Sequence, residues 1–151
     1  MLREEVGVLP HDMGLDQDRR WNVMRALSRL GHPAAAELLV VERSRDTTDQ
    51  GRLSAMRAEV SRPDFGTKAI WIEALLSQNI ELNLADVRAV TAALFPDNQH
   101  GLHMEFSEEI FSGLEIINGS LDASYFRPIQ RGLVKPLCTH QYLKQLNDAI
   151  D

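Results

Sequence analysis

Several features that identify common protein classes are rare or missing in this sequence of 151 residues. Its one cysteine, Cys138, excludes an internal disulfide and a zinc site built from several cysteines, and it fits a reducing compartment. No apolar run reaches the ~18–20 residues that a membrane-spanning helix needs. The first residues include Glu4 and Glu5, where a secretory signal would have a basic end followed by an apolar stretch. We therefore expect a cytoplasmic protein with no membrane partner.

Positive charge is also scarce, because 16 Lys and Arg residues oppose 22 Asp and Glu residues and give a net charge of −6. Non-specific nucleic-acid binding depends on Lys and Arg that displace counterions from phosphates, so this composition argues against a nucleic-acid partner. Aromatic residues make up only 6% of the chain, but 44% of the residues are hydrophobic. A chain of this length buries roughly 70% of its unfolded surface, so we expect one stable globular domain.

Apolar residues recur at helical spacing along most of the chain. Residues 1–15 contain three Gly or Pro residues and no sustained periodicity, so we predict a linker or flexible N-terminus there. Residues 16–151 are predicted to form a helical-repeat domain. Gly31 is predicted to end the first helix in the left-handed conformation. Thr48, Asp64 and Asn83 are predicted N-caps, and Asn83 with Asp86 resembles a capping box.

The second half of the chain contains the most regular amphipathic stripe. Its apolar positions predict a single helix over residues 102–117, beginning near Gly101. A further helix is predicted to begin at Asp122 and either to kink or to begin late at Pro128, because proline removes a helix hydrogen bond. Thr139 is a predicted N-cap for the last helix.

The predicted helices fall into pairs whose first members begin near Asp16, Thr48, Asn83 and Asp122. This spacing of roughly 32–39 residues is typical of stacked helix-pair repeats. No stretch alternates with period two over the length of a strand, which argues against a sheet. We therefore predict an all-α fold of stacked antiparallel helical hairpins, a HEAT/armadillo-like α-solenoid of about four pairs. A plain helix bundle is the alternative.

His100, His103 and Glu105 form the first candidate metal site, because zinc accepts imidazole and carboxylate ligands. On a helix, however, Glu105 would lie about 200° around the axis from His103 and would point away from a shared ion. A structural or surface role is therefore the preferred interpretation. Met104-Glu105 matches only two residues of a Met-Glu-Asn substrate-anchoring strand, and the surrounding segment is helical.

Other catalytic patterns are missing from the sequence. It has no His-Glu-X-X-His zinc helix, nucleophile elbow, phosphate-binding loop or dinucleotide-binding turn. Cys138 and His140 are two residues apart, whereas catalytic Cys and His residues usually meet through the fold, so we interpret Cys138 as a small buried residue. Trp21 and Trp71 are predicted to anchor the core.

A set of helix-end, turn and core residues is spread over about residues 16–150. Its members are Arg20-Trp21, Leu27, Gly31, Asp46-Thr47-Thr48-Asp49-Gln50-Gly51-Arg52, Ala55, Arg57-Ala58, Arg62-Pro63, Lys68, Trp71, Leu82-Asn83, Val87-Arg88-Ala89, Phe95-Pro96 and Gln99. This set resembles the C-terminal helical domain of bacterial aminopeptidase N-type zinc metallopeptidases, a domain shared with the endoplasmic-reticulum aminopeptidases.

The resemblance implies a stack of helical repeats that forms a bowl over a separate, upstream catalytic domain and contacts the peptide substrate. The parent enzyme would remove N-terminal amino acids from peptides with zinc bound in that catalytic domain. The zinc helix and the substrate-anchoring strand are absent from this chain, so no catalytic, cofactor or metal residue is assigned here. The substrate-contacting residues are unknown, and Met1 is either a natural start or a boundary within a longer protein.

The resemblance also implies that the second helix of each pair lines the concave side of the bowl. That surface is predicted to be acidic, with Arg43 and Lys68 as the few opposing bases, and to favour cationic peptides. The acidic residues are Glu37, Glu42, Glu73, Glu105, Glu108 and Glu109.

Two other functions fit the sequence. A free-standing helical-repeat adaptor would bind a protein partner in its groove, because a fold alone does not determine function. A small metal-dependent enzyme would use His100 and His103. The reading frame upstream of Met1 would distinguish these hypotheses, because an in-frame His-Glu-X-X-His motif is expected there only for the peptidase domain.

Overall fold

The structure of the chain is a computed structural model that describes residues 14–135 and 140–148. These ranges form α-helices and one 3₁₀ turn without any strand, so the predicted all-α fold class is confirmed. Most of the predicted linker, Cys138 and the Thr139 cap lie outside the described residues. The helices are α1 (Gln17–Arg29), α2 (Ala35–Arg45), α3 (Asp49–Val60), α4 (Phe65–Leu75), α5 (Leu84–Ala93), α6 (His100–Glu105), α7 (Ser107–Ile117), α8 (Ala123–Leu133) and α9 (His140–Asp148), and η1 is Asp97–Gln99.

The predicted Gly31 helix end and the predicted N-caps Thr48, Asp64 and Asn83 are confirmed. Gly31 has φ +68°, and the amide of His32 donates to the carbonyl of Leu27 at 2.9 Å, as in a Schellman cap. The Asp86 side chain, by contrast, accepts from Arg52 and contributes only its backbone amide to the predicted capping box. The N-cap side chains that accept a backbone amide are Asp16 (from Arg19), Thr48 (from Gly51), Asp64 (from Thr67), Asn83 (from Asp86) and Asp122 (from Ser124).

The prediction of a single helix over residues 102–117 was wrong. The helical path breaks at Phe106, which separates α6 from α7, and α6 begins at His100 rather than at Gly101. The break places the Phe106 ring against Phe65, with ring centres 4.5 Å apart. The hydroxyl of Ser107 donates to the carbonyl of Met104 at 2.7 Å, so a side chain takes an acceptor that a continuous helix would use.

A late start at Pro128 was also wrong. Helix α8 begins at Ala123 and passes through the proline, which is its sixth residue. Farther along α8, Gly132 lies so close to Thr91 of α5 that a Cβ atom would overlap the threonine side chain. The glycine therefore lets α5 and α8 pack closely.

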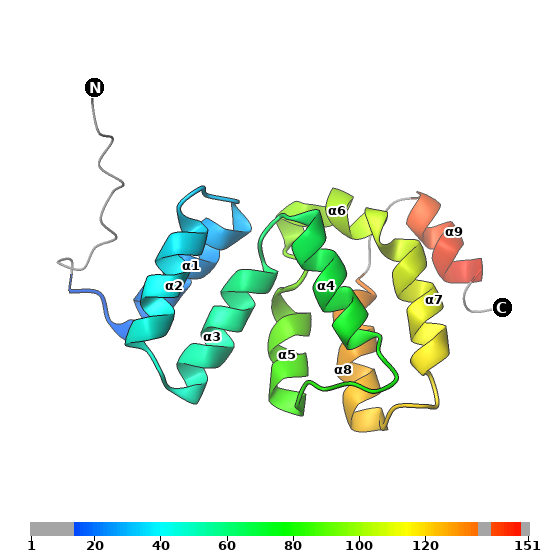
Figure 1. Ribbon diagram of the computed structural model, residues 1–151. Helices are drawn as coiled ribbons and strands as arrows, with labels where there is room; N and C mark the ends of the chain where they lie inside the picture. Colours follow the sequence, from blue (N-terminus) through cyan, green and yellow to red (C-terminus); the bar gives the residue numbers. More distant parts are fainter. Residues whose placement is uncertain (1–13, 136–139, 149–151) are drawn as a thin grey trace.

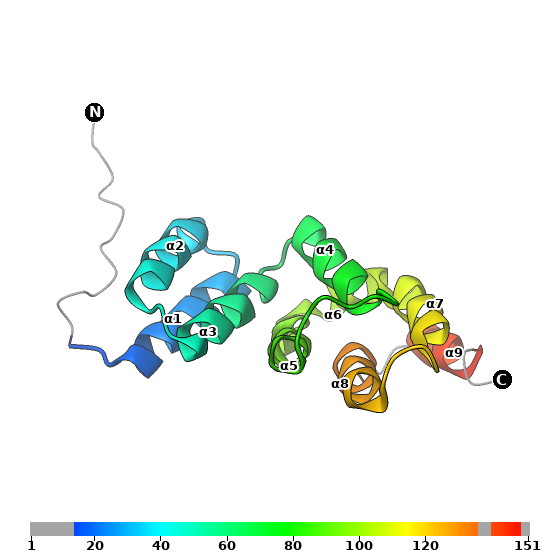
Figure 2. The same ribbon diagram turned by 60° about the horizontal axis from the view of Figure 1, so that its bottom comes forward.

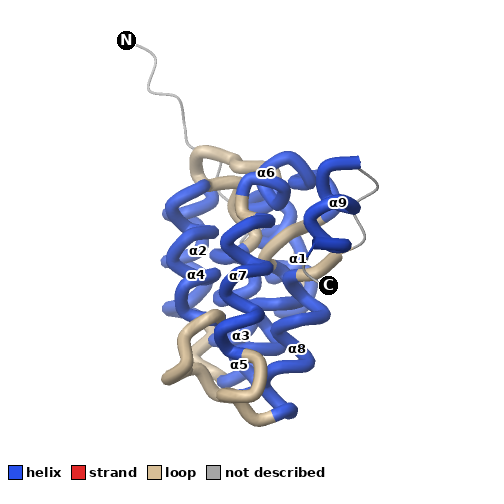
Figure 3. The backbone as a smooth tube through the Cα atoms, turned by 90° about the vertical axis from the view of Figure 1, so that its right-hand side faces the viewer, coloured by secondary structure: helices blue, strands red, loops and turns tan. Residues whose placement is uncertain are grey.

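Successive helices alternate between two layers (Figure 1). The first helices of the pairs, α1, α3, α5 and α8, lie side by side, and each packs on the next. The second helices α2, α4 and α7 lie farther apart (Figure 2). Along the stack, α2, α4 and α7 fall on one side and α1 and α8 on the other (Figure 3). That the second helices line a concave side stays a prediction.

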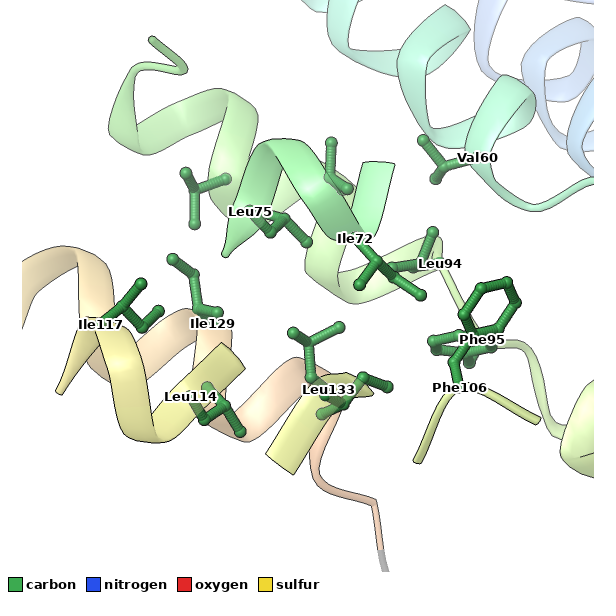
Figure 4. Packing of buried hydrophobic residues seen from close by; sticks show 13 residues of the cluster. Val60, Ile72, Leu75, Leu94, Phe95, Phe106, Leu114, Ile117, Ile129 and Leu133 are labelled. Carbon is green, nitrogen blue, oxygen red and sulfur yellow. The ribbon is translucent and has the colours of Figure 1, made fainter. Parts of the chain in front are cut away.

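The described residues form two apolar clusters. The larger contains 13 buried residues, from the end of α3 to α8, and its side chains point toward one another between the layers (Figure 4). The smaller contains Trp21, Met24, Leu39, Ala55 and Ala58. Helix α3 contributes to both clusters and therefore joins the two halves of the stack. No helix in the described part of the chain has the length and apolarity needed to cross a bilayer.

Candidate functional site

His103, from the candidate metal site, is directed into the core. Its Nε2 lies 2.7 Å from the carbonyl oxygen of Leu133, and its ring stacks on Phe95 with ring centres 4.2 Å apart. Burial lowers the pKa of His103 to about 4, so the ring is neutral at pH 7 and Nε2–H donates to the carbonyl. His100 and Glu105 are exposed, and no three potential metal-ligating side chains gather within residues 14–135 and 140–148. The structure thus gives His103 a structural role.

Lys68, in the first turn of α4, is completely buried. Its Nζ donates to the carbonyl of Val60 at 2.6 Å and also to the carbonyl of Leu94, and it lies 5.5 Å from the centre of the Phe95 ring. Burial, with the nearby charge of Lys135 as a smaller cause, lowers the pKa of Lys68 to about 7. None of the ion pairs within the described residues involves Lys68. Carbonyls at helix ends, which carry partial negative charge, take the place of a carboxylate.

Gln99 and Lys135 make similar contacts with helix ends. The amide nitrogen of Gln99 donates to the carbonyl of Arg29 at 3.1 Å and to that of Ser61 at 2.8 Å. Lys135 Nζ donates to the carbonyl of Phe95. These carbonyls belong to the unsatisfied ends that every helix leaves at its carboxyl terminus.

Lys68, Gln99, His103 and Lys135 are here called the carbonyl clamp. They satisfy carbonyls at the carboxyl ends of all four first helices: Gln99 at α1, Lys68 and Gln99 at α3, Lys68 and Lys135 after α5, and His103 at α8. Sequence reasoning missed this cluster. Lys68 shares one helical face with Ile72 and Leu75, which was a usable signal that it is buried.

The buried carboxylate of Asp46 joins the first helix pair to the second. It accepts from Trp21 Nε1 at 2.7 Å, from the Thr48 hydroxyl at 2.6 Å and from the Gln17 amide. These hydrogen bonds, led by the one from Thr48, lower the pKa of Asp46 to about 2. Gly51 passes so close that a Cβ atom there would overlap the carboxylate. Both oxygens of Asp46 are engaged in hydrogen bonds that hold the helices, so we assign it a structural role.

The two tryptophans differ in their surroundings. Trp21 is buried in the smaller cluster, so its prediction as a core anchor is confirmed. Trp71 is half-buried against the larger cluster and also borders a groove of about 400 Å³ together with Met56, Arg43 and Arg52. Cys138 lies outside the described residues.

A hollow of about 410 Å³ opens on the first-helix layer beside the carbonyl clamp. It spans α1, α3 and α5, and part of its lining consists of the small side chains of Ala26, Ala92 and Ala93, with Pro96. These side chains leave space that larger residues would fill. We take the hollow as the candidate binding site, because spaces between packed helices are among the places where ligand sites occur.

The hollow is lined by four cationic residues, Arg25, Arg29, Arg57 and Lys135, and by one acid, Asp97. We call it the arginine hollow. Its residues are far apart in the sequence, and no motif marked them as a site. Their charge is opposite to the one predicted for the concave surface.

The predicted acidic surface on the second helices is only partly present. Glu42 is buried, with Oε1 2.7 Å from Nε of Arg20, and Lys68 belongs to the carbonyl clamp. The other predicted carboxylates are exposed, namely Glu37, Glu73, Glu105, Glu108 and Glu109. They lie on the second helices or beside them, away from the lining of the arginine hollow.

No protein-family model matches the chain, and no curated protein matches it. The structure shows the fold class of the chain, and its family and function are proposed below.

Proposed function

We propose that the chain is the non-catalytic C-terminal helical domain of an aminopeptidase N-like zinc metallopeptidase. The parent is proposed to be a cytoplasmic enzyme that removes N-terminal amino acids from peptides. In this role the domain covers the catalytic cavity and contacts the peptide, while an upstream domain supplies the zinc and the catalytic residues. A zinc-bound water there would supply the nucleophile.

The observation that carries the proposal is where the residues of the resemblance lie in the fold. Many of them hold one helix pair against the next through long-range hydrogen bonds, which solvent-exposed repeat positions would not do. These residues are Trp21, Asp46, Arg52, Lys68 and Gln99.

Two surfaces fit the proposed contacts. The arginine hollow offers a recessed polar surface for a peptide. The second helices expose Val40 at 66%, Ile70 at 67% and Ile116 at 58%. Apolar side chains of this size fit a face that another protein surface covers. The same apolar face would serve the alternative function, a free-standing adaptor, by binding a separate partner.

The test begins with the complete reading frame of the gene. We expect it to encode a His-Glu-X-X-His helix upstream of this domain. The full-length enzyme should hydrolyse aminoacyl-anilides and lose activity with a zinc chelator, whereas the purified 151-residue chain should not hydrolyse them. A reading frame that begins at Met1 would instead favour the adaptor. Turnover by the chain that survives repurification and disappears in a point variant of the chain would contradict the proposal.

A further inference from the structure

The arginine hollow has a charge opposite to that of the chain as a whole. The chain carries a net charge of −6, yet the hollow is lined by Arg25, Arg29, Arg57 and Lys135 with only Asp97 opposing them. Most of the acidic residues therefore lie elsewhere. Cations around a recessed space attract anions more strongly than the same cations on a flat surface, because the protein walls exclude part of the solvent.

The three arginines of the hollow, Arg25, Arg29 and Arg57, are not held by carboxylates in the described part of the chain. Arg52, outside the hollow, is held by Asp86 at 2.7 Å. Arg29 and Arg57 take part in none of the ion pairs found within the described ranges. Arg57 is half-buried and lines the hollow, and it takes part in no ion pair within the described ranges. An incoming anion could pair with these guanidinium groups.

We propose that the arginine hollow is a carboxylate subsite that gives the domain a preference for acidic peptides. This inference rests on the proposed function, because it assigns a charge class to the peptide that the domain contacts. A guanidinium presents parallel N–H donors that match the two oxygens of a carboxylate. The carboxylate comes from an Asp or Glu side chain of the peptide or from its free C-terminus.

The size of the hollow favours a peptide group over a nucleic acid. Four cations around a space of about 410 Å³ match one or two carboxylates. A nucleic acid would require a longer track of basic residues along its phosphates, and the net charge of −6 opposes such a polyanion. A preference for acidic peptides must then come from the hollow itself, because the overall charge of the chain repels them.

The preference can be measured by fluorescence anisotropy with the full 151-residue chain and three labelled nonapeptides. The first contains three Glu residues, the second has Gln in their place, and both have blocked ends. The third is the Gln peptide with a free C-terminal carboxylate. At about 20 mM salt we expect the Glu peptide to bind roughly fivefold more tightly than the blocked Gln peptide. The difference should shrink at about 300 mM salt, because the screening length shortens.

Substitutions that each remove one positive charge test whether the arginine hollow causes the preference. Arg57→Gln should abolish most of the preference, and Arg29→Gln, at an exposed position, provides a second test if Arg57→Gln fails to fold. Arg127→Gln is the matched control, since Arg127 is exposed on α8 and does not line the hollow. Circular dichroism checks that each variant retains its helices. The control should keep the fivefold preference.

Each outcome separates the subsite from the proposed function. Tighter binding of the Glu peptide assigns the subsite to side chains, and tighter binding of the third peptide alone assigns it to the terminal carboxylate. Equal affinity for all three peptides overturns the subsite and leaves the proposed function standing. An equal loss of preference in Arg57→Gln and Arg127→Gln also overturns it. Failure of every peptide to bind overturns both the subsite and the proposed peptide contact.

Discussion

Helices α1–α3 and helices α4–α8 are held together by different chemistry. The first region has a small apolar cluster and is joined by contacts between side chains, such as Trp21 with Asp46 and Arg20 with Glu42. The second has the cluster of 13 buried residues and is closed by side chains that bind backbone carbonyls, as Lys68 does. Buried polar side chains of the first region pair with carboxylates, whereas those of the second region bind carbonyls at helix ends.

This difference gives the two regions different responses to pH. The pKa of Asp46 is about 2, below its ordinary value of 3.8. Its contribution to stability is present above pH 3.8 and is lost as pH falls toward 2. The pKa of His103 falls from 6.5 to about 4, and that of Lys68 from 10.5 to about 7. A buried base with a lowered pKa makes the native state more stable as pH rises. The second region therefore gains stability above about pH 4, where the contribution of Asp46 to stability no longer changes.

Gly51→Ala should have the largest effect and should disrupt the first region. The added Cβ would overlap the Asp46 carboxylate and displace the hydrogen bonds from Trp21 and Thr48. Overpacking together with the lost bonds should cost about 3 kcal/mol of unfolding free energy. Urea unfolding followed by circular dichroism measures the loss.

Gly101→Ala is the matched control for this substitution. Gly101 lies in α6, and a Cβ atom there would have no neighbour within 4 Å. Alanine in place of an unstrained helical glycine should raise the unfolding free energy by about 0.5–1 kcal/mol. A similar loss in both variants would show that Gly51 has no special contact with Asp46.

Lys68→Met should have a smaller effect, visible mainly as a change in pH dependence. Between the native pKa of about 7 and the unfolded value of 10.5, the unfolded state binds more protons than the native state. The unfolding free energy of the unchanged protein should therefore rise by about 2 kcal/mol from pH 7 to pH 9. Lys68→Met should lack this rise.

Denaturant unfolding of both proteins at several pH values measures this slope. The comparison is between slopes, so a constant loss of stability from the unsatisfied carbonyls in Lys68→Met does not obscure it. Equal slopes in the two proteins would mean that Lys68 stays charged in the folded state.

Arg43→Gln should have the smallest effect. Arg43 is 2.5 Å from Glu59, but both side chains are substantially exposed, at 47% and 34%. Exposed ion pairs contribute little, so the expected loss is below about 0.5 kcal/mol.

Arg20→Gln is the comparison variant and should cost about 2 kcal/mol, because it removes the close partner of the nearly buried Glu42. Thermal melts of the two variants, compared with the unchanged protein, test whether burial of the carboxylate decides the cost.

Helix ends could be predicted from the sequence because capping is local. Asp64 and Asn83 need only the amide three residues later, and Gly31 needs only the preceding turn. The break at Phe106 could not be predicted in this way. It depends on Phe65, a residue 41 positions earlier that meets the Phe106 ring only after the pairs have stacked.

The candidate site was less predictable than the fold. The cations of the arginine hollow come from Arg25 and Arg29 on α1, Arg57 on α3 and Lys135 after α8. In the sequence, each alone has the pattern of an ordinary surface charge. Only the packing of first helices against one another brings them around one space, and no short motif records that packing.

Gln99 has a further consequence for how the stack melts. In helical-repeat proteins each repeat contacts its neighbours, so structure can be lost progressively from the ends. Gln99 follows α5, yet its amide reaches the carbonyl of Arg29, 70 residues earlier, as well as that of Ser61. Fraying of the first pair therefore breaks bonds made by the third. We therefore expect this connection to couple the unfolding of the first pair to that of the third, which is not adjacent to it in the sequence.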